Sequence, residues 1–194
     1  MKSSKLPVVF FDFDGVFNWA GASRSKRKKY ADAPGYWKKT SIWVDDNKVK
    51  GWFEVEWSAE LTEKLNVLKV EHPFSWVWLT TWVNHTAKLD QLLDVKSDDT
   101  LIWDAYPDKE LLKNFSGDIT QFRATEKLKT VLDWVNSNPD TPFVWVDDEA
   151  TSLWTDELDA KTLAPHLIVT PLADYGLVGY ELTKITEFIT KYSV

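Results

Sequence analysis

Residues 6–16 read Leu-Pro-Val-Val-Phe-Phe-Asp-Phe-Asp-Gly-Val, an apolar run followed at once by two acidic residues. The run predicts a buried strand over about residues 7–12, with Asp12 and Asp14 at its carboxyl end. Side chains two residues apart in a strand point to the same side, and Gly15 permits a sharp turn out of the sheet. Two carboxylates this close need a cation, and Mg²⁺ fits best because it prefers carboxylate and carbonyl oxygens and keeps positions for phosphate. The stretch indicates a site for phosphoryl chemistry, although a solvated strand end would also contain such a pair.

Two later apolar runs also end at polar residues. Residues 74–82 predict a strand that ends at Thr80 and Thr81, and residues 143–149 predict one that ends in adjacent aspartates. Taken alone, the threonines reflect strand propensity and the aspartates could cap a strand-to-helix turn. Three tryptophans that follow motif residues could line the mouth of a site: Trp19, Trp37 and Trp82.

A lysine lies between these two strands, on a predicted helix. Thr125 is a possible N-cap, and Lys127 precedes an amphipathic stripe. A lysine at such a position is usually at the surface. One helix and one strand separate Lys127 from Asp147, which is the spacing that a doubly wound fold requires. This distance favours Lys127 over Lys129 as the lysine of the site.

The order along the chain is therefore strand plus D-x-D-G, strand plus threonine, lysine on a helix, and strand plus Asp-Asp. This ordered set resembles the four motifs of the haloacid dehalogenase (HAD) superfamily of phosphatases and phosphotransferases, and it spans Asp12 to Asp148. The resemblance implies an α/β fold: one doubly wound, Rossmann-like domain over residues 1–194, with a mainly parallel sheet and a small cap.

The resemblance also implies roles for the motif residues. Asp12 would be the nucleophile that forms an aspartyl-phosphate, and Asp14 would act as general acid and then as general base. Thr80, with Thr81 as the alternative, would hydrogen-bond the phosphoryl oxygens, and Lys127 would neutralise charge on the nucleophile and on the transferred group. Asp14 favours a phosphatase, because dehalogenases of the superfamily lack a carboxylate at this position.

The same resemblance implies a Mg²⁺ site. Its ligands would be Asp12, Asp147, Asp148 and the backbone carbonyl of Asp14, and the sequence leaves open which of Asp147 and Asp148 binds directly. The sequence does not support a zinc site, because His72, His85 and His166 are scattered and cysteine is absent. It does not support a nucleoside-triphosphate site of the P-loop type either, because no G-x-x-x-x-G-K-[ST] loop occurs.

The predicted cap, residues 18–57, is small. Residues 41–57 alternate and predict a β-hairpin that turns at residues 45–48. The remaining elements are predicted as follows: a helix after Ser58, a helix at 86–95, a strand at 100–103, a loop and short helix at 107–124, a strand at 166–169 and a helix at 180–192. A small cap implies an open site.

The cap contains a cluster of basic residues, although the net charge of the chain is −7. Together with Lys38 and Lys39, these residues are interleaved with Tyr30, Tyr36 and Trp37. Such a composition suits a nucleic acid, and the alternative is a solvated basic loop. Its members are Arg24, Lys26, Arg27, Lys28 and Lys29. Within the superfamily, the Trp-rich motifs look most like small HAD domains of bacteria and phages that are placed with RNA-repair proteins.

The overall composition indicates the class of protein to which the functional hypotheses apply. The chain has 194 residues, 44% hydrophobic and 27% charged, without an apolar run of transmembrane length, so we expect a globular, soluble and cytoplasmic protein with no membrane partner. The leading hypothesis is a Mg²⁺-dependent phosphomonoesterase that acts on a phosphorylated substrate, and its more specific form acts on nucleic-acid ends or on nucleotides. The alternatives are a small-metabolite phosphatase or phosphotransferase, and a binding module without turnover; the sequence does not define the oligomeric state.

Overall fold

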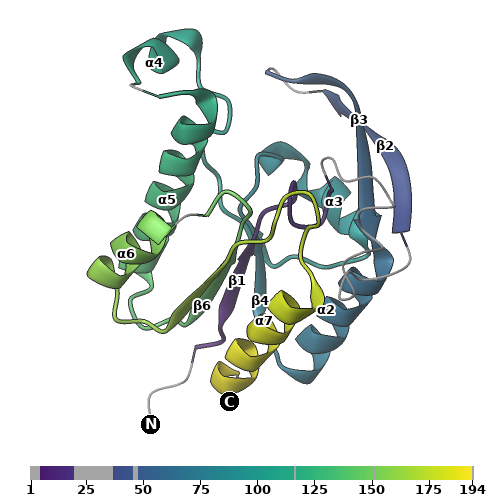
Figure 1. Cartoon of the computed structure of the whole chain (residues 1–194), viewed down its shortest axis with the longest axis vertical. Coiled ribbons are helices and arrows are strands. Elements are labelled where there is room, and N and C mark those ends of the chain that lie inside the picture. The colour runs from purple at the N-terminus through teal and green to yellow at the C-terminus, as the bar shows by residue number, and fades with distance from the viewer. Residues whose placement is uncertain (1–4, 20–36, 46–47, 116, 151, 194) are drawn as a thin grey trace.

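A parallel β-sheet forms the centre of the protein (Figure 1). The computed structural model describes residues 5–19, 37–45, 48–115, 117–150 and 152–193. Within these residues the sheet has five strands in the order β5-β4-β1-β6-β7, and all neighbouring pairs are parallel. The strands are β1 (Val8–Phe11), β4 (Ser75–Trp78), β5 (Asp99–Thr100), β6 (Phe143–Val146) and β7 (His166–Val169). The predicted α/β class with a mainly parallel sheet is confirmed.

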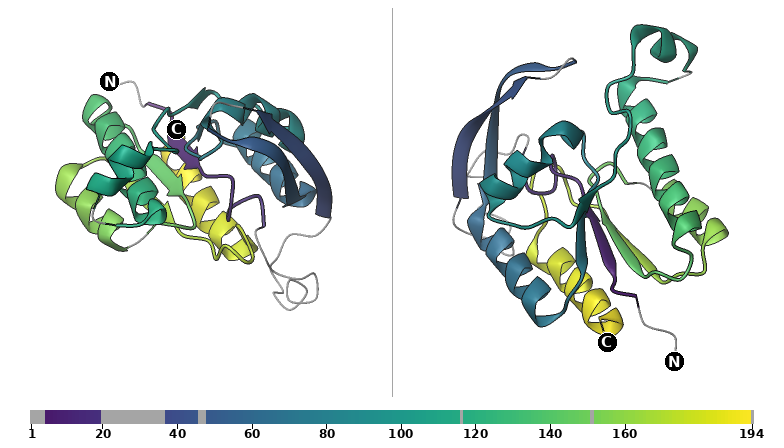
Figure 2. Two further views of the ribbon diagram at one scale, coloured as in Figure 1. Left: turned by 90° about the horizontal axis from the view of Figure 1, so that it is seen from above. Right: turned by 180° about the vertical axis from the view of Figure 1, so that it is seen from behind.

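Helices cover both faces of this sheet (Figure 2). Alternate side chains of each strand point to opposite faces, so Val9 and Phe11 pack in one core while Val8 and Phe10 pack in another. The first core is completed by α2 (Ala59–Glu71), α3 (Thr86–Leu93) and α7 (Gly179–Tyr192), and the second by α5 (Ile119–Ser137) and α6 (Ser152–Lys161). Burial of both faces explains why the strands are continuous apolar runs.

Three elements differ from the prediction. The helix that carries Lys127 begins at Ile119, because Asp118 and Gln121 form a capping box, whereas Thr125 lies inside the helix and donates to the Gln121 carbonyl. Strand β5 ends at Thr100 instead of residue 103. Helix α6 was not predicted, and the short α4 (Lys109–Asn114) falls in the region where a short helix was expected.

The predicted hairpin is present and is longer than expected. Strands β2 (Trp37–Asp45) and β3 (Lys50–Ser58) pair antiparallel, and the hairpin rises beside the carboxyl end of the sheet (Figure 1). Val44 and Val55 on its inner face are buried, whereas Trp52 on its outer face is 69% exposed. Cap residues 20–36 lie outside the described residues. Among the described helices, none has the length and apolar character needed to cross a membrane.

The packing of α2 generates a stability prediction. Leu65 is fully buried in the first core, whereas Val70 on the same helix is 83% exposed. We expect Leu65→Ala to lower the free energy of unfolding by about 2–5 kcal/mol through lost burial and a residual cavity. The matched variant Val70→Ala should change it by no more than about 0.5 kcal/mol. Urea denaturation measures both, and equal effects would contradict the assignment of this face to the core.

Candidate active site

The predicted motif residues meet at the carboxyl end of the sheet. Asp12 follows β1, Thr80 follows β4 and Asp147 follows β6, and β1 lies between the other two strands. Lys127 approaches from α5, on the same helix face as the core residue Val131. All four motif side chains are buried. The fold therefore concentrates charged and polar groups in a region from which water is largely excluded.

The ammonium group of Lys127 lies between two carboxylates. Its Nζ donates to Oδ2 of Asp12 and to Oδ2 of Asp147, the latter at 2.8 Å, and lies 3.6 Å from Oε2 of Glu149. Burial alone would lower the pKa of Lys127, but the charges of Asp12 and Asp147 and their hydrogen bonds outweigh it and raise the pKa. Lys127 therefore stays positively charged.

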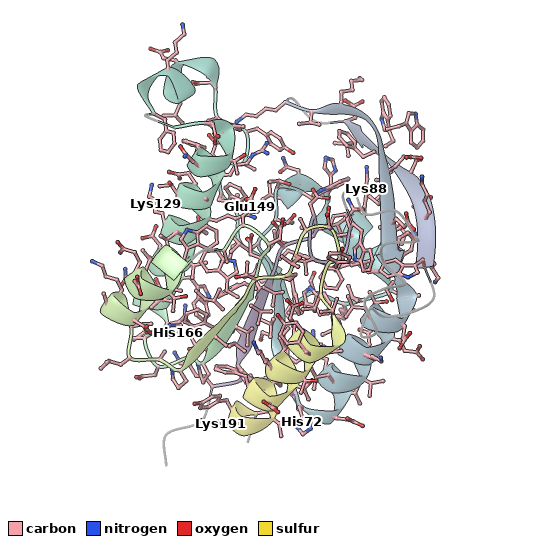
Figure 3. The ribbon with its side chains drawn as sticks, viewed as in Figure 1. His72, Lys88, Lys129, Glu149, His166 and Lys191 are labelled. Atoms are coloured by element: carbon pink, nitrogen blue, oxygen red, sulfur yellow. The ribbon has the colours of Figure 1, made fainter. Side chains whose placement is uncertain are left out.

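Lys129 lies elsewhere. Its side chain is 67% exposed and lies near Glu126 of its own helix, on the outer side of α5, whereas Glu149 lies at the centre of the molecule above the sheet (Figure 3). Of the two lysines considered, the structure places Lys127 at the site.

Three carboxylates form a group suited to a metal ion. Asp12, Asp147 and Asp148 each offer an oxygen, and these oxygens lie within 4.8 Å of one another. When all three carboxylates are ionised, as metal binding requires, they exceed the single positive charge of Lys127. Carboxylate oxygens are preferred ligands of Mg²⁺, so the donor set fits the predicted ion. The Asp14 carbonyl stays a predicted ligand.

The acids in this group repel one another. Burial, followed by the charge of Asp12 and that of Asp147, raises the pKa of Asp148 to about 7. Burial also raises the pKa of Asp147 to about 6; the charge of Lys127 opposes this shift and that of Asp12 adds to it. A divalent cation would relieve this repulsion.

Gly15 makes room for Asp148. The residue has a φ of +71°, which disfavours an L side chain, and a Cβ at this position would lie 2.2 Å from Cγ of Asp148. The glycine of the D-x-D-G motif is thus needed both for the turn and for the position of an acid 133 residues later in the chain.

Asp14 lies in different surroundings from Asp12. Its carboxylate accepts hydrogen bonds from Nδ2 of Asn18 at 2.6 Å and from Nε1 of Trp82 at 2.9 Å. Burial raises the pKa of Asp14; the Asn18 hydrogen bond opposes this shift, and the charge of Asp12 adds to it. A raised pKa keeps a proton available on Asp14, as a general acid requires.

The two threonines are placed differently. Thr80 is fully buried, its hydroxyl accepts from the backbone N–H of Trp82 at 3.3 Å, and its carbonyl accepts from Nε1 of Trp103 at 3.1 Å. A hydroxyl that accepts retains its own proton for donation. Thr81 is half-buried and lines a pocket beside Asp14. The roles predicted for both threonines stay predictions.

Sequence reasoning missed several residues of the site. Asn18 contacts Asp14 within the turn after β1, Trp103 contacts Thr80 through tertiary structure, and Glu149 adds a further acid near Lys127. Of these residues, only Glu149 could have been found from the sequence, because it directly follows the Asp-Asp pair. The basic cluster at residues 24–29 lies outside the described residues, so its role in substrate binding stays a prediction.

The comparisons with known proteins agree with this geometry. The family model described as "HAD domain in Swiss Army Knife RNA repair proteins" matches residues 8–178 and thus contains every motif residue named above. No curated protein and no solved structure matches the chain. Because the match covers most of the sequence, the chain belongs to the family of HAD domains found in Swiss Army Knife RNA repair proteins.

Proposed function

We propose that the protein is a Mg²⁺-dependent phosphomonoesterase that forms an aspartyl-phosphate on Asp12. Membership of the HAD family suggests a phosphatase-type hydrolase. The observation that carries the finer proposal is the buried ammonium of Lys127, hydrogen-bonded to Asp12 beside two further acids. A nucleophilic carboxylate, a fixed positive charge and an acidic metal site are the parts that phosphoryl transfer to a carboxylate needs.

The first half of the reaction uses Asp12 and Asp14. A carboxylate oxygen of Asp12 attacks phosphorus, and the bond between phosphorus and the ester oxygen breaks. The proton held by Asp14 passes to the departing oxygen, which leaves as an alcohol. Lys127 stabilises the charge on the transferred group, and the hydroxyl of Thr80 donates to a phosphoryl oxygen.

The second half regenerates the enzyme. Asp14, now ionised, accepts a proton from a water molecule that attacks phosphorus, and the acyl-phosphate bond to Asp12 breaks to release inorganic phosphate. Mg²⁺ bound by Asp12, Asp147 and Asp148 would supply positive charge against the phosphoryl oxygens. The substrate in the finer form of the proposal is a nucleic-acid end or a nucleotide, because the matched family is described in RNA repair proteins.

The covalent step generates the first functional prediction. Asp12→Asn keeps the shape of the side chain but cannot form an acyl-phosphate, so we expect kcat to fall by at least about 10³-fold. Asp133→Asn on the exposed side of α5 is the matched control and should retain full activity. Para-nitrophenyl phosphate hydrolysis measures both, with circular dichroism to check the fold. Near-normal turnover by Asp12→Asn would exclude the aspartyl-phosphate mechanism.

The metal site generates a pH prediction. The metal-free folded protein holds a proton on Asp148 up to about pH 7, whereas the unfolded chain loses it near its ordinary value. The folded state thus binds more protons, and this group lowers stability as pH rises through that interval. Because Mg²⁺ competes with the proton, its stabilising effect should grow between about pH 5 and about pH 8.

Thermal unfolding with Mg²⁺ and with EDTA measures this increment in Tm. Asp148→Asn removes one of the two metal-site acids with a raised pKa, so it should show a smaller increment with a weaker pH dependence, to which Asp147 still contributes. Activity should stop in EDTA and return with Mg²⁺. Full activity in chelator would rule out the proposed metal requirement.

The basic cluster generates a prediction about substrate. Neutralising Arg24, Lys26, Arg27, Lys28 and Lys29 together should weaken activity on phosphorylated oligonucleotides and reduce its salt dependence, because these charges would attract the phosphate backbone. Hydrolysis of para-nitrophenyl phosphate should change little, since that ester needs only the catalytic groups. Equal loss on both substrates would indicate a structural loop, and no loss on either would favour a metabolite phosphatase.

A further inference from the structure

A small pocket of about 80 Å³, partly open to solvent, lies beside Asp14 between the hairpin and the loops that follow β4 and β5. Its walls are largely apolar and include several rings. The principal lining residues are Asp14, Val44, Phe53, Trp82, His85 and Tyr106. We propose that this pocket is the leaving-group subsite and that it binds a flat aromatic ring, such as a nucleobase. The inference rests on the proposed phosphatase function and adds to it the chemical class of the substrate.

The position of the pocket relative to Asp14 supports this assignment. The general acid must lie next to the ester oxygen that it protonates, so the leaving group extends from Asp14 away from the transferred phosphoryl group. Asp12 and Lys127 do not line the pocket, whereas Asp14 and Thr81 do. The pocket thus borders the acid but not the nucleophile, as a leaving-group subsite should.

The walls define what kind of group would fit. The indole of Trp82 is held by its hydrogen bond to Asp14 and by edge-to-face contacts with Phe13 at 5.4 Å and Phe53 at 5.7 Å. Tyr106 adds another ring, which lies 5.0 Å from the guanidinium of Arg123. Fixed aromatic walls favour stacking with a planar ring. The volume lies below the usual range for sites that enclose a whole ligand, so at most a single ring system, inserted from the open side, fits here.

The pocket is already partly open to solvent. Next to its lining residues Val49 and Tyr106, Lys48 pairs with Asp104 in the loop after β5 at 2.9 Å, and both side chains are about half exposed. Exposed ion pairs contribute little to stability, so this pair holds the two segments together only weakly. A ring that is still attached to a longer chain could therefore enter from the open side, as could a free nucleotide.

The experiment compares an aromatic with an aliphatic ester. Phe53→Ala and Tyr106→Ala should each lower kcat/KM for 1-naphthyl phosphate by about tenfold or more, mainly through KM, because each removes a stacking wall. Glycerol 2-phosphate has no ring, so its kcat/KM should change by less than about twofold. Trp52→Ala is the matched control, because Trp52 is the neighbouring aromatic residue on the outer face of β3 and should affect neither substrate.

Two further substrates show whether the bound ring belongs to a free nucleotide or to a nucleic-acid end. Loss of activity in Phe53→Ala on adenosine monophosphates alone identifies a nucleotide subsite, and loss on 3′- or 5′-phosphorylated oligonucleotides as well identifies a nucleic-acid end. Unchanged kinetics on 1-naphthyl phosphate, or equal loss on glycerol 2-phosphate, would overturn the subsite.

Direct binding distinguishes failure of the subsite from failure of the proposed function. Calorimetry should detect adenosine binding to the native protein and a loss of at least about fivefold in affinity in Phe53→Ala. If no phosphate ester is hydrolysed but adenosine binds in this way, the phosphatase proposal fails and the ring subsite stands. If esters are hydrolysed but adenosine does not bind to the native protein, the subsite is wrong.

Discussion

The structure depends on one buried ammonium group. Lys127 has no exposed surface, and its Nζ bridges Asp12 at the end of β1 and Asp147 at the end of β6. An uncompensated charge in such a place costs several kcal/mol, so none of the three groups can be buried without the others. The contact therefore fixes helix α5 against two neighbouring strands and leaves excess negative charge, with Asp148, where a cation would bind.

The two acids of the D-x-D motif differ because of their neighbours. Asp12 faces the ammonium of Lys127, whereas Asp14 accepts hydrogen bonds from two neutral donors, Asn18 and Trp82. Desolvation raises the pKa of Asp14, although both hydrogen bonds oppose this shift. Paired carboxylates in contrasting surroundings are how enzymes assign a nucleophile and an acid to identical side chains.

Much of the fold could be predicted, because β1, β4, β6 and β7 are short apolar runs and the hairpin alternates clearly. Helix α6 was missed, since its sequence Ser152–Lys161 has few apolar residues to mark a period. Strand β5 is short because the chain turns to place Trp103 against Thr80. The burial of Lys127 could be inferred only from motif order, because lysines on amphipathic helices are normally exposed. The contact of Asn18 with Asp14 comes from the turn after β1, and no sequence period marks it.

The hairpin and the charged groups belong to separate parts of the chain, and Trp82 touches both, through Phe53 on one side and Asp14 on the other. The inner face of β3 can therefore change in evolution without disturbing the ion pairs of Lys127, provided that the indole keeps its place. Such an arrangement lets paralogues diverge in what they recognise while they inherit one reaction. That independence ends at Trp82, where a change alters the surroundings of Asp14 and the pocket wall together. It also ends at Asn18, which accepts from the backbone N–H of Glu56 in β3 and donates to Asp14.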